Sequence, residues 1–474
     1  MSDNSKLKLG ALTALVVGSM IGGGIFSLPQ NMASGAGAGA TLIGWAITAV
    51  GMLMLAFVFQ NLALHKPELD NGVYAYAKAG FGNYLGFSSA WGYWISAWIG
   101  NVSYLVLLFG TLGYFFPILG EGNTPIAIVC ASILLWLVHL LVLRGIKEAA
   151  FINLVTTIAK IVPLLTFIVL VGLAFKADVF NTDFWGNADA NLGSVTNQVK
   201  SMMLVTVWVF IGIEGASVYS ARAEKRSDVG KATVMGFFGV LALLVLVNVL
   251  SLGVMSRPEL AELKNPSMAS VLQHVVGSWG AAFISIGLII SLTGALLSWV
   301  LLSGEILFSA AKDHTMPNFF GKENKNGVPA NALWVSNGAI QLFLIITLFS
   351  SSSYLQLLYL ATSMILMPYF FSTAYAVKLA LTGDGYETDS RHKTRDLVIG
   401  VVAMVYSMWL LYAAGAKYLL LSALLYAPGA IVYYIARREN NKLVFTNIEK
   451  VYFALSVIGA IVAAIGLFNG SLEL

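Results

Sequence analysis

Gly18-Ser-Met-Ile-Gly-Gly-Gly-Ile-Phe-Ser-Leu-Pro29 lies in the second half of the first long apolar segment of this 474-residue chain. Three consecutive glycines, Gly22 to Gly24, interrupt a segment expected to be a continuous membrane helix, and each costs about 1 kcal/mol relative to alanine. In a bilayer, irregular backbone persists only where it lines a cavity. Free N–H groups at the start of the resumed helix would form an anion site. The stretch therefore predicts a site for the carboxylate of an amino acid. Close helix packing through Gly18 and Gly22 is the alternative explanation.

Composition places the chain among polytopic membrane proteins, because 58% of its residues are hydrophobic and only 11% are charged. The single cysteine, Cys130, excludes a disulfide framework and a zinc site built from thiolates. The five histidines are scattered, so the catalytic cluster that a membrane enzyme needs is missing from the sequence. A repeated selectivity-filter loop, which would indicate a channel, is also missing. We expect no metal, no cofactor, no nucleic-acid partner and no enzymatic activity.

Apolar stretches of about 20 residues predict an all-α polytopic fold with about thirteen spans. The predicted spans are 9–28, 40–64, 84–116, 124–143, 150–175, 198–221, 230–255, 280–310, 333–350, 354–380, 397–415, 417–437 and 451–469.

The placement of Lys and Arg predicts the orientation. Of the 27 such residues, 21 fall in connections on the side of the N-terminus, five fall on the opposite side, and Lys160 lies within a span. Because cytoplasmic loops carry the excess of positive charge, we expect a cytoplasmic N-terminus and an external C-terminus.

A second interrupted segment occurs in the sixth span, Phe210-Ile-Gly-Ile-Glu-Gly-Ala-Ser217, where two glycines flank an acid. Spans one and six are five apart, and an odd offset gives two copies of a five-span repeat opposite topology. This is the plan of inverted-repeat transporters, in which two discontinuous helices meet at a midplane substrate site. The prediction is a first repeat over residues 1–175, a second over 198–380 and extra C-terminal helices over 397–469.

Three ionisable residues remain within the predicted spans: Lys160, Glu214 and Glu305. A charge inside a membrane is costly and is normally paired, faces a cavity and has a function. We predict that all three take part in proton coupling, or that Lys160 supplies a fixed positive charge in place of a sodium ion. A static ion pair between Lys160 and Glu305, a structural hydrogen bond of Glu214, and an interfacial position of Glu305 are the alternatives. If all three ionise, the surplus negative charge favours a cationic substrate.

Aromatic residues precede two of these acids by six positions, namely Trp208 before Glu214 and Trp299 before Glu305. Most aromatic residues of a membrane protein serve packing or the interfacial belt. Those near the interruptions are candidates for a cation–π contact with a substrate side chain. Asn101, a polar residue within the third span, is suited to a hydrogen bond with substrate, and interhelical packing is the equal alternative.

Four stretches together resemble the basic amino acid/polyamine antiporters of the amino acid–polyamine–organocation superfamily, and among these the bacterial arginine/ornithine exchangers. They are Gly18-Ser-Met-Ile-Gly-Gly-Gly-Ile-Phe26, Trp94-Ile-Ser-Ala-Trp-Ile-Gly-Asn101, Trp208-Val-Phe-Ile-Gly-Ile-Glu-Gly-Ala-Ser217 and Ser298-Trp-Val-Leu-Leu-Ser-Gly304. The resemblance implies two inverted five-helix repeats, with interrupted helices one and six, that alternate between outward- and inward-facing states.

The resemblance also implies roles for single residues. The carboxylate site corresponds to Gly23 and Gly24, the stacking tryptophan of helix eight to Trp299, and the membrane lysine of proton-coupled relatives to Lys160. Gly23 replaces a serine of the arginine/agmatine exchanger, and Tyr104 replaces a smaller or more flexible residue. The implied substrate-binding set is Ile21, Gly23, Gly24, Ser96, Ala97, Asn101, Tyr104, Trp208, Ile211, Glu214 and Trp299.

These observations predict a membrane antiporter that exchanges a cationic amino acid, arginine for ornithine in the first place, by alternating access. An exchanger of an amino acid for its decarboxylated amine is the alternative, with histidine/histamine, lysine/cadaverine or tyrosine/tyramine as pairs. A proton-coupled importer that uses Lys160 is a further one. We expect amino acids or amines and membrane lipid as partners, a homodimer as the candidate assembly, and the bacterial inner membrane as the location.

Overall fold

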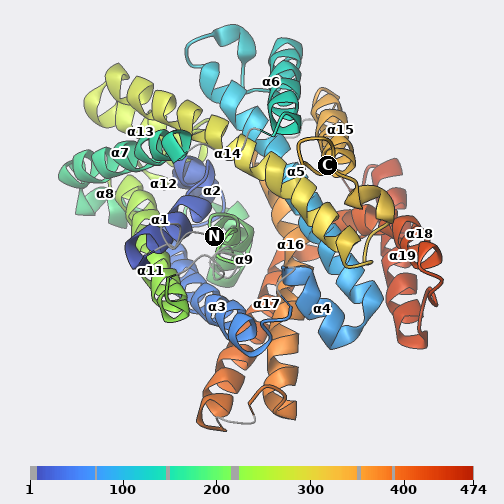
Figure 1. Cartoon of the computed structure of the whole chain (residues 1–474). Helices are drawn as coiled ribbons and strands as arrows, with labels where there is room; N and C mark the ends of the chain where they lie inside the picture. Colours follow the sequence, from blue (N-terminus) through green and yellow to red (C-terminus); the bar gives the residue numbers. More distant parts are fainter. Residues whose placement is uncertain are drawn as a thin grey trace. The chain divides into compact units, whose positions relative to one another are not determined.

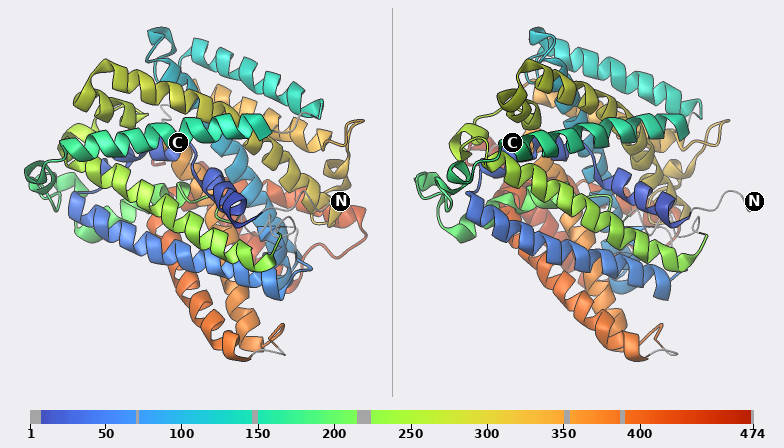
Figure 2. Two further views of the ribbon diagram at one scale, coloured as in Figure 1. Left: turned by 60° about the vertical axis from the view of Figure 1, so that its left-hand side comes forward. Right: turned by 90° about the vertical axis from the view of Figure 1, so that its left-hand side faces the viewer.

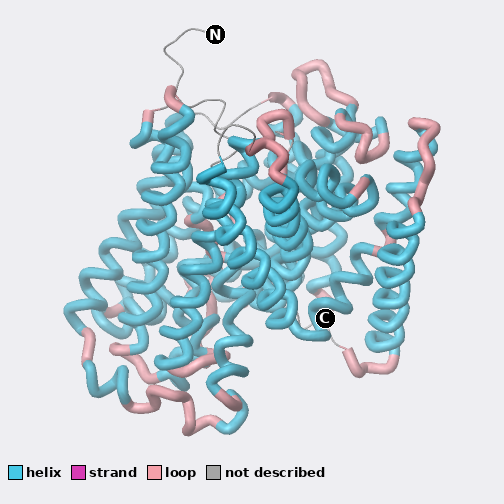
Figure 3. The backbone as a smooth tube through the Cα atoms, turned by 90° about the horizontal axis from the view of Figure 1, so that it is seen from below, coloured by secondary structure: helices cyan, strands magenta, loops and turns pink. Residues whose placement is uncertain are grey.

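The computed structural model describes residues 8–69, 72–145, 150–214, 224–349, 354–386 and 390–472 (Figure 1). Within these ranges the backbone consists of helices and connecting loops, without a strand (Figure 3). The first part of the chain forms α1 (Leu9–Met20), α2 (Leu28–Ala33), α3 (Ala38–His65), α4 (Val73–Phe81), α5 (Asn83–Leu112), α6 (Pro125–Leu143), α7 (Ala150–Ala174), α8 (Ala177–Asn181) and α9 (Val195–Trp208). The rest forms α11 (Arg226–Leu252), α12 (Arg257–Ala261), α13 (Ser267–Val276), α14 (Ser278–Lys312), α15 (Ala330–Thr347), α16 (Tyr354–Thr382), α17 (Ser390–Tyr426), α18 (Gly429–Glu439) and α19 (Asn447–Phe468).

Ten helices of the described chain are long and apolar enough to cross a membrane. The bent pair Leu12–Met20 and Gly24–Ala33 makes an eleventh if it is taken as one span. This confirms an all-helical membrane fold and gives fewer spans than the predicted thirteen. One reason is that α9 has only 14 residues: residues 209–214 of the predicted span 198–221 form turns, and residues 215–221 lie outside the described ranges.

The predicted spans 397–415 and 417–437 fall within one apolar stretch, His392–Glu439, in which two helices meet at a kink at Gly415. Within it, α17 continues through Gly415, whose φ of 72° lies in the left-handed region. Glycine takes this conformation readily because it has no Cβ. The predicted boundary therefore coincides with a kink and not with a loop.

The chain forms two compact units, each assembled from segments far apart in sequence. The first unit contains residues 1–56, 103–131 and 148–296, and the second contains residues 57–102, 132–147 and 297–474. In the first unit α1 packs on α11, α11 packs on α7, and α2 packs on α12 (Figure 2). The predicted division into repeats at 1–175 and 198–380 stays a prediction.

Two glycines of α14 allow it to approach α7 closely within the first unit. A Cβ at Gly287 would meet the ring of Pro163 at 2.5 Å, and one at Gly294 would meet the side chain of Thr156 at 2.3 Å. Lys160 lies four residues after Thr156 and three before Pro163, so the three share one face of α7. The lysine therefore lies on the face where the two helices are closest.

The second unit is built around α16, which packs on α17 and on the short helix α4. Helix α19 packs on α17 in turn. Polar side chains join other helices of this unit. The indole N–H of Trp94 on α5 donates to Ser336 Oγ on α15 at 2.8 Å, and Asn337 on α15 lies 2.7 Å from the ring nitrogen Nδ1 of His139 on α6.

Candidate functional site

The first predicted interruption is present. Helix α1 ends at Met20, Ile21 has extended backbone with ψ of 96°, and the chain turns at Gly22 and Gly23 before a 3₁₀ turn, Gly24–Ser27, leads into α2. The pieces on either side of the turn are bent by 43°. The segment Ile21–Gly24 is therefore a break between two half-helices.

Close contacts with side chains explain why three glycines stand together. A Cβ at Gly22 would lie 2.6 Å from the hydroxyl of Tyr104, and one at Gly24 would lie 2.8 Å from Cδ1 of Trp208. A Cβ at Gly23 would lie 2.8 Å from methyl groups of both Leu107 and Leu292. A Cβ at Gly18, in contrast, would meet nothing within 4 Å, so a Gly18–Gly22 packing face does not account for the motif.

The N–H groups of Gly22, Gly23 and Gly24 donate no hydrogen bond within the part of the chain that the structure describes. The carbonyl of Gly23 accepts from the backbone N–H of Phe26. The rings of Tyr104 and Trp208 lie against this backbone and contact each other edge to face, with centroids 6.1 Å apart. Backbone N–H groups in such a position can bind a small anion, and the two buried aromatic rings can contact a cationic side chain.

The second predicted interruption begins where α9 ends at Trp208, and residues 209–214 form turns. Gly212 has a φ of 107°, and a Cβ there would lie 2.7 Å from the backbone oxygen of Ser19. Only glycine meets both requirements. The N–H of Gly212 donates to Oε2 of the buried Glu214 at 3.2 Å. Residues 215–217 of the motif lie outside the described ranges.

Two polar contacts hold the end of α1. The hydroxyl of Ser19 lies 2.8 Å from the carbonyl of Val16 and 3.2 Å from the carbonyl of Gly212, so its proton is shared between α1 and the second interruption. The ammonium of Lys160 on α7 donates to the carbonyl of Gly18 at 3.3 Å. Gly18 belongs to the last turn of α1, where carbonyls lack helical partners and a cation is favoured by the helix dipole.

The first unit thus brings together Ile21, Gly23, Gly24, Tyr104 and Trp208, with Ile211, Glu214 and Lys160 on adjoining segments. The remaining predicted residues belong to the second unit, where each is described by itself. On α5, Ser96, Ala97 and Asn101 are buried, and neither polar atom of the Asn101 amide has a hydrogen-bond partner among the described residues. On α14, Trp299 is half-buried, while Glu305 is exposed and accepts from the hydroxyl of Ser309 at 3.3 Å.

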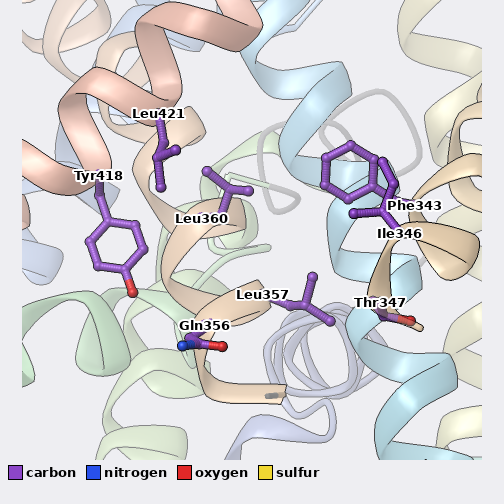
Figure 4. A pocket seen from close by; sticks show the side chains of 8 residues that line it. All are labelled: Phe343, Ile346, Thr347, Gln356, Leu357, Leu360, Tyr418 and Leu421. Atoms are coloured by element: carbon purple, nitrogen blue, oxygen red, sulfur yellow. The ribbon is translucent and has the colours of Figure 1, made fainter. Parts of the chain in front are cut away.

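A pocket in the second unit lies between α15, α16 and α17 (Figure 4). Its lining is largely apolar and contains no charged group and none of the predicted residues, so it lacks what a zwitterion or a cation requires. The lining consists of Phe343, Ile346, Thr347, Gln356, Leu357, Leu360, Tyr418 and Leu421.

Sequence reasoning missed a polar network around α2. The buried Arg257 donates to the carbonyl of Ala33 at 3.2 Å and to the carboxylate of Asp189 at 2.8 Å. The amide of Asn265 donates to the side chains of Gln30 and Asn31 at 3.1 and 2.9 Å. The backbone N–H of Asn191 and the Arg257 guanidinium hold the pKa of Asp189 below its usual value. Nothing in the local sequence signals these contacts, because they join segments far apart in the chain.

A family model described as amino acid permease matches residues 7–428. The chain belongs to the amino acid permease family. Membership confirms the resemblance inferred from the four motifs and the prediction of a membrane transport protein rather than an enzyme.

Relatives of this permease are similar over nearly their whole length. An arginine/ornithine antiporter of Pseudomonas aeruginosa is 68% identical, with 100% of this chain and 99% of the relative covered. An L-lysine transport protein of Corynebacterium glutamicum is 47% identical over 98% and 95% of the two chains. An arginine/agmatine antiporter of Chlamydia pneumoniae is 43% identical over 97% and 96%.

Proposed function

We propose that this permease is an antiporter that exchanges a cationic amino acid for a related amino acid or amine, with arginine and ornithine as the principal pair. The observation that carries the proposal is the break at Gly22–Gly24, where three backbone N–H groups have no partner in the described chain and lie between Tyr104 and Trp208. The antiporter of Pseudomonas aeruginosa, at 68% identity, supports the choice of substrates.

In this proposal the substrate carboxylate accepts hydrogen bonds from Gly23 and Gly24, with Ile21 and Ile211 forming apolar walls. Tyr104 and Trp208 limit the space beside the carboxylate, and Trp299 stacks on the cationic side chain. Asn101 hydrogen-bonds to substrate together with its neighbours Ser96 and Ala97. Support for the role of Asn101 comes from its buried amide, because a buried polar group without a partner is costly unless a ligand satisfies it.

Lys160 acts in this scheme as a fixed cation at the end of α1 or as a proton carrier, and Glu214 and Glu305 are the acids that exchange protons with it or with the substrate. The hydrogen bond from Lys160 to the Gly18 carbonyl supports the role of a fixed cation. This carbonyl lies at the end of an interrupted helix, where carbonyls lack helical partners and a metal cation would also bind.

The proposed topology has thirteen spans, two inverted repeats over residues 1–175 and 198–380, and C-terminal helices over 397–469. The stretch His392–Glu439 supports two crossings, because its 48 residues are divided by the kink at Gly415 and one crossing of a bilayer core needs only about 20 residues. With an odd number of spans and the observed bias of Lys and Arg, the N-terminus is cytoplasmic and the protein resides in the bacterial inner membrane. A homodimer surrounded by lipid is the proposed assembly.

The decisive experiment is counterflow in proteoliposomes that are preloaded with ornithine, agmatine, histamine or buffer and then given labelled arginine. We expect rapid arginine uptake into ornithine-loaded vesicles and only background uptake into vesicles that contain buffer. Equal uptake into both would reject obligate exchange and favour an importer.

A second candidate, exchange of an amino acid for its decarboxylated amine, is favoured by the 43% identity to an arginine/agmatine antiporter. The same vesicles separate the two, because arginine–agmatine exchange moves net charge and arginine–ornithine exchange does not. Uptake that follows an imposed membrane potential, and that agmatine loading stimulates more than ornithine loading, would establish this second function.

Replacement of Trp299 by leucine tests the stacking role. We expect about a tenfold higher KM for arginine, because a desolvated cation–π contact is worth up to about 2 kcal/mol. The matched control is Trp334→Leu, at an exposed tryptophan of α15. An unchanged KM in Trp299→Leu would remove Trp299 from the site.

A further inference from the structure

The start of α5 is held by the C-terminal part of the chain. Tyr84, in the first turn of α5, is buried, and its backbone N–H donates to Oε1 of Glu449 at 2.7 Å. Glu449 belongs to α19, which begins after the family match ends at residue 428. An element outside the family match therefore supplies a hydrogen-bond acceptor to one of the unpaired N–H groups at the start of α5.

The carboxylate of Glu449 serves two helices at once. Its second oxygen, Oε2, accepts from the backbone N–H of Thr446 at 2.8 Å in the capping box of α19. Glu449 is only 4% exposed and forms no ion pair with any described Lys or Arg. Each oxygen thus has one backbone donor, and the negative charge lies at the N-terminal ends of two helices, where their dipoles favour it.

Gly82 leaves room for this arrangement. Its φ is 101°, and a Cβ added there would lie 3.2 Å from Oε1 of Glu449. Glycine before the first residue of α5 permits both the left-handed backbone and the close approach of the carboxylate.

Other contacts from the same C-terminal part follow the next turns of α5. The ring of Tyr84 lies 5.0 Å from that of Tyr433 and 5.1 Å from that of Phe445, and the ring of Phe87 lies 5.2 Å from Tyr433. The indole N–H of Trp91 donates to the carbonyl of Leu425 at 3.0 Å. The first turns of α5 are therefore anchored by residues 425–449, on α17, α18 and α19 (Figure 1).

We infer that Glu449 is a positioning residue for transport: it fixes α5, and through α5 the substrate contacts that this helix carries. The inference rests on the proposed function, because α5 is continuous from Asn83 to Leu112 and bears both Asn101 and Tyr104. Because α5 is one continuous helix, a shift of its anchored end tilts the whole helix and changes the position of both side chains. In this inference helices α18 and α19 contribute to transport by holding α5 in position.

The test compares Glu449→Gln with Thr446→Ala. Glutamine has one acceptor oxygen where the carboxylate has two, so one of the two buried N–H groups loses its partner. We expect KM for arginine in counterflow to rise about fivefold in Glu449→Gln, because a buried N–H without an acceptor destabilises the start of α5. The maximal rate per folded protein should stay within about twofold of the wild type. Thr446→Ala removes only the threonine hydroxyl of the α19 cap, and its KM is expected to stay within about 1.5-fold of the wild type.

A rescue variant separates positioning of α5 from stability of α19. Asn83→Asp combined with Glu449→Gln restores an anion at the start of α5 without repairing α19, and we expect KM to return to within about twofold of the wild type. A lack of rescue, or an equal rise of KM in Thr446→Ala, would overturn the inference. If Glu449→Gln does not fold, Glu449→Asp replaces it, since the shorter side chain keeps the charge but loses its reach to Tyr84.

Hydrogen exchange of the Tyr84 amide supplies a readout that does not depend on the substrate. We expect it to exchange at least tenfold faster in Glu449→Gln than in the wild type, and at the wild-type rate in Thr446→Ala. Failure of wild-type vesicles to exchange arginine would reject the proposed function and leave this measurement in place. An unchanged KM and an unchanged exchange rate in Glu449→Gln would reject the role of Glu449 alone.

Discussion

The two half-helices on either side of Gly22–Gly24 are held in different ways. The C-terminal half, α2, is fixed by directional hydrogen bonds: Arg257 and Asn265 donate to it, and Ser267 Oγ accepts from the backbone N–H of Gln30. The N-terminal half, α1, rests on α11 through apolar contacts of Leu12 with Val229 and Ala232, and on few polar contacts at its end. Hydrogen bonds fix position closely, whereas apolar contact is non-directional and tolerates sliding. We therefore expect α2 to be held more firmly than α1, although α11 packs on both half-helices.

Gly212→Ala is expected to have the largest effect on this arrangement, because its Cβ would meet the Ser19 carbonyl at the end of α1 and its φ of 107° is unfavourable for alanine. We expect about 3 kcal/mol of destabilisation and loss of exchange. Gly18→Ala is the matched control, since its Cβ meets nothing. Thermal unfolding in detergent and counterflow would measure both, and equal behaviour of the two variants would contradict the contact.

Arg257→Ala removes the charged hydrogen bonds that join α2 to Asp189. We expect about 2 kcal/mol lower stability, because the Ala33 carbonyl and the Asp189 carboxylate both lose a charged donor. The segment should also become more accessible, which thiol labelling of Ser34→Cys in both backgrounds would reveal. If labelling is as slow in Arg257→Ala as in the parent, α2 is held by something other than this network.

Lys160→Met tests the hydrogen bond from α7 to the Gly18 carbonyl at the end of α1. Loss of a cation at the end of a helix is expected to lower stability by about 1 kcal/mol and to change the dependence of exchange on pH. Lys176→Met, at an exposed lysine beyond the end of α7, is the control and should behave as the wild type. An unaltered pH profile in Lys160→Met would remove the residue from proton coupling and leave it a structural role.

The smallest expected effect is the response of the α2 network to acid. The pKa of Asp189 is lowered first by the N–H of Asn191 and then by Arg257, so its stabilising effect is present above its unfolded-state pKa and is lost as pH falls through the lower folded-state value. The melting temperatures of the wild type and Asp189→Asn should therefore differ by a constant amount from about pH 8 to 5, and converge below about pH 4. Convergence at neutral pH would show that Asp189 is not held in its charged form.

The sequence predicted the break at Gly22–Gly24 and the end of α9 near Gly212 because adjacent glycines in an apolar segment carry a local signal. Hydropathy likewise located the long helices, although α17 runs through the predicted boundary with a kink at Gly415. The side chains that meet the break, such as Tyr104 and Leu292, could not be predicted, because they depend on how distant segments pair. The bond between Tyr84 and Glu449, 365 residues apart, has the same origin.

The hydroxyl of Ser19 belongs to the last turn of α1 and reaches across to the carbonyl of Gly212. The same hydroxyl lies 2.8 Å from the carbonyl of Val16, one turn back in α1, so its single proton is shared between helix α1 and the non-helical backbone at Gly212. If the backbone at Gly212 moves away from α1, the hydroxyl keeps its bond to Val16, so this contact can open without leaving the donor unpaired.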